Sequence, residues 1–409
     1  YGNAGRTPPA ALTIDRMVEL QTAYESIKDA RRQIDFEDVL LAAAGMIEAE
    51  PRIAQQVREQ YRFFVVDEYQ DVSPLQHELL RLWVGDRDDL CVVGDVSQTI
   101  YSFAGASPDF LLRFASQHEN AAVLRLERNY RSTPEIVHAA NRLMTNQKGA
   151  LTLQAATSEH SDAPHVTGYD NDNEEATAIA AAIAAQIAAG VSPEEIAVLY
   201  RINAQSQPIE AALAAAGVPF LVRGATRFFD QREVKEAIML LRGASISTAT
   251  EPLFKSVSDI LRSIGWSQDP PETPGAVRER WESLNVIMRL AEEASPEVTL
   301  REFVADLVDR QSSNNEPLRS AVNLATLHSA KGLEWECVHL IGLNEGLLPI
   351  SYARTPEAID EERRLLYVGI TRARRSLGMS WSASAQTGRG ARRAPSRFLD
   401  DVRDRNQRL

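Results

Sequence analysis

At 409 residues, the chain is too long for one compact hydrophobic core, so two or more domains are expected. Hydrophobic residues make up 44% and charged residues 25%, the balance of an ordinary soluble protein, and no stretch approaches the roughly 20 apolar residues that span a bilayer. The net charge of −13 argues against a protein whose whole surface attracts nucleic acid.

The cysteines and the N-terminal residues bear on the cellular compartment. Cys91 and Cys337 each lie in an apolar run, and neither has a cysteine or histidine at the spacing of a metal site. The chain does not start with a basic segment followed by an apolar one, which is the pattern of a secretory signal. We therefore expect a cytoplasmic protein with two buried, unpaired thiols and no membrane contact.

The first third of the chain is predicted to pass from helices to an alternation of strands and helices. Helical spacing of apolar residues covers 13–33 and 34–60, and Asp35 is placed to cap the second helix. Buried parallel strands are predicted at 63–66, 90–95 and 123–128, with a helix at 74–84. Such an alternation is typical of an α/β domain with a parallel sheet.

A second α/β unit is predicted further along, with a helical insertion. Helices are predicted at 134–147, 174–189, 205–216 and 231–242, and strands at 196–200 and 218–222. The stretch 244–321 contains no convincing strand, whereas the runs VNLATLH and ECVHLIGL after it are strand-like again. The helical stretch is therefore predicted to be inserted into the second unit.

The strongest motif is FFVVDEYQD at 63–71. An apolar strand delivers Asp67 and Glu68 to the carboxyl edge of a sheet, where open α/β folds bind ligands. In phosphoryl transfer, the first acid would hold Mg²⁺ and the second would orient and activate the attacking water. A bare pair of acids is more often an exposed strand end, but the four apolar residues before this pair favour a site.

Two further motifs follow, VVGDVSQTIYSFAGA at 92–106 and LERNYRSTPEI at 126–136. Gln98 follows a buried strand and is placed to contact a γ-phosphate or its water. Tyr101 and Phe103 alternate with small residues, which suits stacking on single-stranded bases but fits a core loop equally well. Arg131 suits charge stabilisation on a phosphoryl group, although a lone arginine is more often an ion-paired surface residue.

The last two motifs are ATLHSAKGLEWECV at 325–338 and EERRLLYVGITRARRSL at 361–377. His328, Lys331 and Glu334 crowd the loop after a strand, and Arg372 and Arg374 follow a buried, helix-like run. The arginines of this C-terminal region have no acid between them, which fits a nucleic-acid contact or simply a solvated face. Each of these pieces alone is a weak signal.

Together and in this order, the five segments resemble motifs II to VI of superfamily 1 helicases of the UvrD/PcrA/Rep branch. The segments RINAQSQPIEAAL, DFEDVL and PSRFL are similar to that branch as well, so the resemblance covers nearly the whole chain. It implies an α/β fold with two RecA-like parallel-sheet motor domains of the P-loop NTPase type and helical accessory insertions. The implied function is that of an ATP-dependent 3′-to-5′ DNA helicase or single-stranded DNA translocase in DNA repair or replication.

The resemblance also implies roles at the reacting phosphate. Asp67 would bind Mg²⁺, and Glu68, beside the metal, would be the catalytic carboxylate. Gln98 would sense the γ-phosphate of ATP. Arg131 and Arg372 would reach the same phosphate from the second α/β unit.

The remaining implied roles concern the nucleoside and the DNA. Tyr130 would stack on adenine and Glu334 would contact the ribose, whereas Tyr101, Phe103 and His328 would touch single-stranded DNA. The implied partners are single-stranded DNA, junctions of single and double strands, and DNA-repair proteins, in a cytoplasmic, nucleoid-associated setting.

The expected domain order is a remnant of a helical insertion (1–33), a first motor domain (34–125), a second motor domain in two parts (126–243 and 322–409), and between those parts a reduced helical accessory domain (244–321).

Two departures from the family pattern stand out. The phosphate loop G-x-x-x-x-G-K-[ST] does not occur, because the chain has no Gly-Lys dipeptide, and Ala104 stands where the family usually has arginine. We interpret the chain as a fragment that is inactive without an upstream phosphate loop. A non-hydrolysing DNA-binding subunit is the alternative, and a helicase–nuclease would need a nuclease domain beyond Leu409.

Overall fold

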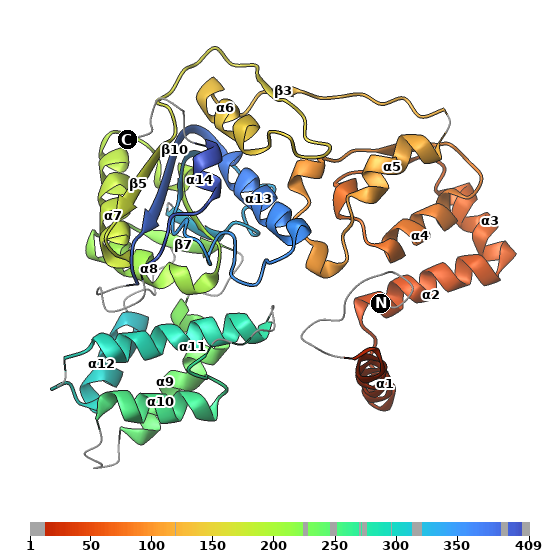
Figure 1. Ribbon diagram of the computed structural model, residues 1–409. Helices are drawn as coiled ribbons and strands as arrows, with labels where there is room; N and C mark the ends of the chain where they lie inside the picture. Colours follow the sequence, from red (N-terminus) through yellow and green to blue (C-terminus); the bar gives the residue numbers. More distant parts are fainter. Residues whose placement is uncertain are drawn as a thin grey trace. The chain divides into compact units, whose positions relative to one another are not determined.

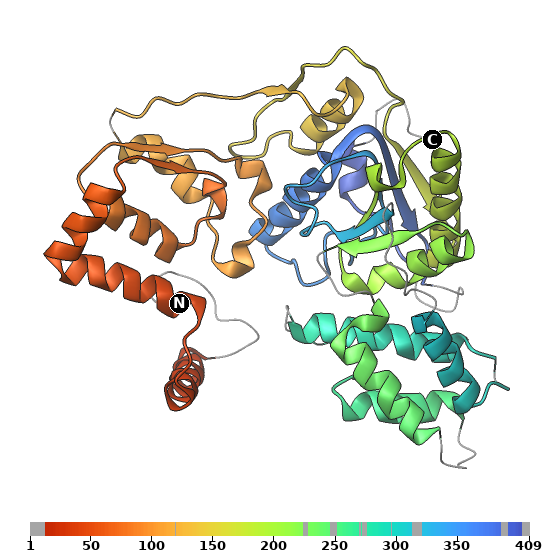
Figure 2. The ribbon, with the colours of Figure 1, turned by 180° about the vertical axis from the view of Figure 1, so that it is seen from behind.

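The computed structural model describes residues 13–118, 120–223, 228–245, 252–269, 271, 276–295, 297–312, 321–385 and 392–402. Their contacts form two compact units (Figures 1 and 2). The first unit extends to Leu126 and includes Gln147–Ala150, and the second unit holds Glu127–Asn146 and the chain from Leu151 onward. Within the described ranges, no helix combines the length and apolar character needed to cross a membrane.

The first unit combines helices with a two-stranded parallel sheet. Its helices are α1 (Ile14–Arg31), α2 (Phe36–Ala49), α3 (Pro51–Gln60), α4 (Pro74–Val84) and α5 (Asp109–Gln117), and its strands are β1 (Phe64–Val66) and β2 (Leu90–Val92). Asp35 caps α2 as predicted, in a reciprocal capping box with Asp38. The Lys28 ammonium of α1 lies 2.9 Å from the Asp35 carboxylate and 2.7 Å from that of Asp38, so this cap also anchors α1.

The strand prediction for the first unit is confirmed in part. One face of β1 and β2 packs on residues of α4 and α5, but Val65 on the other face is 77% exposed, so the expected burial on both faces was wrong. The strand predicted at 123–128 was also wrong over 123–127, which has no strand. No described strand pairs with this apolar run, and its Leu124 and Leu126 side chains are exposed.

The second unit is built on a six-stranded sheet in which every neighbouring pair is parallel, with the order β5-β10-β9-β6-β8-β7. The strands are β5 (His165–Tyr169), β6 (Ile196–Tyr200), β7 (Phe220–Arg223), β8 (Val322–Thr326), β9 (Trp335–Leu340) and β10 (Ala373–Ser382). All five residues of β6 are buried, as its uninterrupted apolar run predicts. A separate parallel pair joins β3 (Arg128–Asn129) to β4 (Gln154–Ala155).

Helices cover both faces of this sheet. They are α6 (Pro134–Leu143), α7 (Asp172–Ala188), α8 (Ser206–Ala215), α13 (Pro356–Ile370) and α14 (Phe398–Val402). α7 and α8 share a hydrophobic core with Cys337 of β9, whereas Gly369 of α13 lies against Leu340 of the same strand. Because side chains alternate along a strand, Cys337 and Leu340 face opposite sides, so the sheet is sandwiched between helices. The predicted α/β class with parallel sheets is confirmed.

Four helices in the described residues between β7 and β8 form a compact cluster, drawn green to teal in Figure 1. They are α9 (Arg232–Ala244), α10 (Leu253–Ser263), α11 (Ala276–Glu293) and α12 (Leu300–Ser312). Their shared core includes Leu241, Leu284 and Leu307. Because β7 and β8 are adjacent strands, the cluster leaves and re-enters the sheet at one place, as expected for an insertion. Since α9 packs in this core, we propose that the helical subdomain begins before residue 244.

Candidate functional site

The first unit presents its two adjacent acids directly after β1. Asp67 and Glu68 are both exposed, and the Asp67 carboxylate accepts a hydrogen bond of 2.8 Å from the Glu68 backbone N–H. Glu68 adopts the left-handed conformation with φ of 54°, which a side chain other than glycine rarely takes. A strained backbone at the carboxyl end of a parallel strand is typical of a residue positioned for function.

A buried glutamine connects these acids to the end of β2. Gln70 is fully buried, its side-chain N–H₂ donates to the Glu68 carboxylate, and its carbonyl accepts a 3.0 Å hydrogen bond from the Asp95 backbone N–H. A Cβ added at Gly94 would lie 2.5 Å from the Gln70 carbonyl oxygen, so glycine is required for this close approach. Gln70 lies within the motif FFVVDEYQD, but no role was predicted for it. The only sequence signal was an amide beside two acids.

Gln98 belongs to the same hydrogen-bonded chain. Its side-chain nitrogen donates to the Asp95 carboxylate at 3.0 Å, and the other oxygen of Asp95 accepts from the Ser97 backbone N–H at 2.9 Å. Glu68, Gln70, Asp95 and Gln98 therefore form one continuous polar network at the carboxyl edge of β1 and β2. The structure thus brings together Glu68 and Gln98, the two residues of this network for which contacts with a phosphate or its attacking water were predicted.

The two predicted aromatic residues lie in the loop that follows. The rings of Tyr101 and Phe103 are 6.0 Å apart, at an interplanar angle of 72°. Phe103 is 78% exposed, so it is not a core residue, whereas Tyr101 is half-buried. Ala104 ends the short 3-10 helix at Ser102–Ala104, and Gly105 follows it with φ of 90°. An exposed aromatic ring in a loop can stack on a base at little conformational cost.

In the second unit, one carboxylate joins two arginines from distant parts of the chain. One oxygen of Glu334 accepts from Nε of Arg131, and the other accepts from Nε of Arg374 at 3.2 Å and from its Nη2. The Arg374 and Arg131 guanidinium groups hold the pKa of Glu334 below its usual value, against the opposing effect of burial. Nearby, the guanidinium of Arg128 lies 5.6 Å from the ring centre of the exposed Tyr130.

Arg372 is placed differently from the expectation of an accessible phosphate ligand. It is only 2% exposed, and its guanidinium donates to the carbonyls of Val368 and Leu333, each at 3.0 Å. Its own carbonyl accepts from the Trp335 backbone N–H at 2.9 Å. Arg372 therefore fixes the loop that carries Glu334, and the phosphate contact implied by the resemblance stays a prediction.

His328 lies at the other edge of this sheet. It follows β8, whereas Glu334 and Arg372 directly precede β9 and β10. The residue implied to contact DNA, His328, therefore lies at the opposite end of the parallel strands from the residues implied to contact the nucleotide. Burial and the nearby Arg201 guanidinium lower the pKa of His328 to about 3, so its imidazole is neutral at pH 7. No role was predicted for Arg201, which forms a bidentate ion pair of 2.8–3.2 Å with Glu362.

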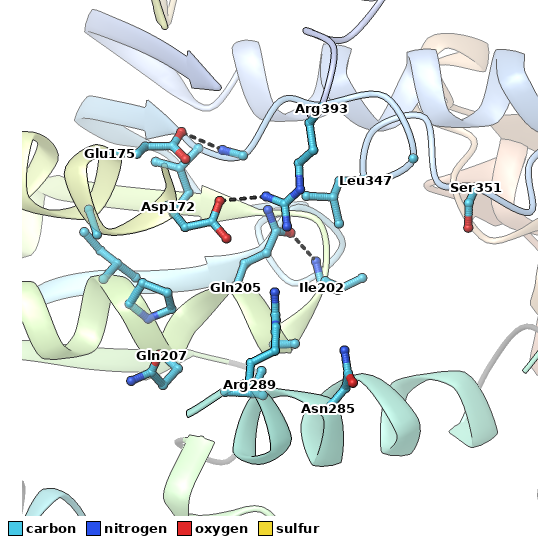
Figure 3. Close-up of a pocket in the computed structure, with 18 of the residues that line it drawn as sticks. Asp172, Glu175, Ile202, Gln205, Gln207, Asn285, Arg289, Leu347, Ser351 and Arg393 are labelled. Atoms are coloured by element: carbon cyan, nitrogen blue, oxygen red, sulfur yellow. Dashed lines mark hydrogen bonds and ion pairs between the residues drawn. The ribbon is translucent and has the colours of Figure 1, made fainter. Parts of the chain in front are cut away.

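A cavity of about 430 Å³ lies between the carboxyl ends of several strands and helix α11 (Figure 3). Asp172 and Arg393 pair across it at 2.6 Å, and Glu175 accepts from the Gly342 backbone N–H at 2.9 Å. Burial raises the pKa of Glu175 to about 7. None of the predicted site residues lines this cavity.

Comparison with known families assigns the chain to a class. Residues 7–119 match the UvrD/REP helicase N-terminal domain, and residues 124–268 and 275–384 match the UvrD-like helicase C-terminal domain. The chain therefore belongs to the UvrD-like helicase family.

Individual relatives extend this likeness over most of the chain. The chain is 43% identical to ATP-dependent DNA helicase UvrD2 of Mycobacterium tuberculosis over 413 residues, which cover 98% of this chain and 59% of the relative. It is 30% identical to DNA helicase II of Escherichia coli, covering 93% and 64%, and 28% identical to ATP-dependent DNA helicase PcrA of Bacillus subtilis, covering 91% and 62%. The chain thus spans about three fifths of the length of these relatives.

Proposed function

We propose that this chain forms most of the motor of an ATP-dependent DNA helicase or single-stranded DNA translocase that moves 3′ to 5′ in DNA repair or replication. The observation that carries the proposal is the network of Glu68, Gln70, Asp95 and Gln98 at the carboxyl edge of β1 and β2. The names of the relatives, which describe ATP-dependent DNA helicases, support the same activity.

The residues after β1 fit Mg²⁺ and ATP as the cofactors. Asp67 and Glu68 offer exposed carboxylate oxygens, and the described residues contain no cluster of three or more His, Cys, Asp or Glu that would enclose a metal. Mg²⁺ is usually held by one or two carboxylates together with the phosphates of its nucleotide, so this donor set is suitable. Bound there, the metal would neutralise charge on the phosphates.

The chain's own groups divide the remaining work. Glu68 would orient and deprotonate the attacking water, and the hydrogen bond from Gln70 would keep its carboxylate directed toward that water. Gln98, held by Asp95, would contact the γ-phosphate or the water. Arg131 and Arg372 would stabilise charge on the transferred group, Tyr130 would stack on adenine, and Glu334 would bind the ribose.

Single-stranded DNA and its junctions with duplex DNA are the proposed substrates. Phe103 and Tyr101 would stack on bases, and neutral His328 would contact the strand without an ion pair. A conformational change driven by ATP binding and reversed on hydrolysis would move the strand past these side chains. Association with repair proteins and with the nucleoid belongs to the same proposal.

The direction of movement provides the test. The full-length protein encoded by the gene is assayed on duplexes with a 3′ or a 5′ single-stranded tail, with and without ATP. The proposal expects ATP-dependent strand separation from the 3′ tail alone. Separation only from the 5′ tail would overturn the polarity, and tight DNA binding without separation or ATP hydrolysis would instead support a non-hydrolysing DNA-binding subunit.

A further inference from the structure

Glu334 holds two arginines at once, and the two contacts are of different kinds. Arg131 uses one nitrogen, Nε, on one carboxylate oxygen, whereas Arg374 places both Nε and Nη2 on the other oxygen. Arg131 lies just after β3 and Arg374 lies on β10, so Glu334 connects two elements far apart in sequence. Its side chain is 33% exposed, so the loss of a partner is only partly compensated by water.

Arg131 is docked on its own unit in this arrangement. Besides the Glu334 contact, its Nη1 donates to the Thr371 carbonyl at 3.2 Å. The Nε–H group of Arg131 cannot donate to the Glu334 carboxylate and to a phosphate at the same time. Arg131 must therefore leave Glu334 if this N–H is to donate to the nucleotide. The departure would leave Glu334 half-buried and without this counter-charge.

Arg374 is suited to remain with Glu334 when Arg131 leaves. Its other acidic neighbours are more distant, since Glu336 lies 3.4 Å and Glu195 3.8 Å from its Nη1. Those contacts use Nη1, whereas Nε and Nη2 are directed at Glu334. Arg374 can therefore keep the carboxylate neutralised and oriented without giving up its other partners.

We propose that Arg374 is a positioning residue, which holds Glu334 in place while Arg131 exchanges that carboxylate for the phosphate of ATP. The Glu334 oxygen that Arg131 leaves then accepts a hydrogen bond from the ribose hydroxyl. Nucleotide binding and the release of Arg131 are thereby coupled at one carboxylate. The inference rests on the proposed function, because it needs Arg131 and Glu334 to be ligands of the nucleotide.

The test is a double-mutant cycle on ATP hydrolysis in the full-length protein. Arg374→Ala should lower kcat/KM for ATP roughly fivefold, mainly by raising KM. Without Arg374, Glu334 would keep its ion pair with Arg131, so that Arg131 would be less available to the nucleotide. In a Glu334→Gln background, the same change should have an effect of less than about twofold, since the neutral amide no longer retains Arg131. Arg374→Lys, which keeps the charge but not the two-nitrogen contact, should fall between wild type and Arg374→Ala.

Arg375→Ala is the matched control. Arg375 is the next residue on the same strand, and its ion pairs are with Glu159 and Glu336, not with Glu334. It should leave KM for ATP within about twofold of wild type. The proposal would be overturned if Arg374→Ala and Arg375→Ala had equal effects, or if Arg374→Ala caused the same fivefold loss with glutamate and with glutamine at position 334. In either case, ATP hydrolysis by the wild type would leave the proposed function intact. A wild-type protein that never hydrolyses ATP would overturn both.

Discussion

Replacing Glu362 by glutamine tests the buried ion pair that Glu362 forms with Arg201 directly after β6, at the carboxyl ends of the strands of the second sheet. The side chains of Arg201 and Glu362 are only 12% and 7% exposed, and Glu362 also accepts a 3.1 Å hydrogen bond from the Ile350 backbone N–H. Removing one partner of a buried pair costs about 3–5 kcal/mol, because the other charge stays buried without compensation. Glutamine keeps the volume and one acceptor, so we expect the lower value, about 3 kcal/mol.

Hydrogen–deuterium exchange of peptides from β6 and α13 measures this loss in the second unit itself. Where exchange follows the free energy of unfolding, about 3 kcal/mol corresponds to roughly 100-fold faster exchange. The control is Asp306→Asn, which breaks the exposed pair between Asp306 and Arg310 and should cost less than about 0.5 kcal/mol. If Glu362→Gln accelerates exchange no more than this control, the buried pair does not stabilise the unit and the reasoning is wrong.

Three further predictions address the cavity and the DNA contact. Gly342→Ala should destabilise the second unit by about 1–3 kcal/mol in urea unfolding, because φ of Gly342 is 64° and a Cβ there would clash with the Gln205 side-chain nitrogen; an unchanged midpoint would contradict this. Burial raises the pKa of Glu175 from 4.5 to about 7, so its contribution to stability is complete below pH 4.5 and is lost as the pH rises through 7. The free energy of unfolding of Glu175→Gln, relative to that of wild type, should therefore increase from pH 5 to pH 8 by up to about 3 kcal/mol. A difference that does not change with pH would contradict the raised pKa of Glu175. Phe103→Ala should weaken single-stranded DNA binding in fluorescence anisotropy about tenfold without changing the unfolding midpoint, and unaltered affinity would remove Phe103 from the DNA contact.

Much of the sheet architecture was predictable because it depends on local patterns. The apolar run of β6 and the acids that end β1 specify both strands and the edge at which Asp67 and Glu68 lie. The run at 123–127 has the same local pattern, but strand formation also needs a pairing partner, and none of the described strands provides one. Pairing is a property of the whole fold, so the sequence run alone could not decide it.

The candidate site likewise contains residues that local patterns could indicate and residues whose contacts only the fold determines. The motifs made Glu68 and Gln98 candidate site residues, but the bridging position of Gln70 depends on the register of β1 against β2 and on the missing Cβ of Gly94. The contact between Arg131 and Glu334 joins residues 203 positions apart, and no local pattern could show that they meet. The burial of Arg372 likewise follows from the packing of two loops.

Steady-state ATP hydrolysis tests the proposed motor most directly. The full-length protein and its Glu68→Gln variant are measured with and without single-stranded DNA, together with DNA binding by both. We expect DNA-stimulated hydrolysis by the wild type and, in the variant, a rate reduced by a factor of about 100 or more with unchanged DNA affinity, because glutamine keeps the shape but not the base. Hydrolysis by the variant at the wild-type rate, or no hydrolysis by the wild type, would contradict the assignment of Glu68 as the catalytic carboxylate of an ATP-driven motor.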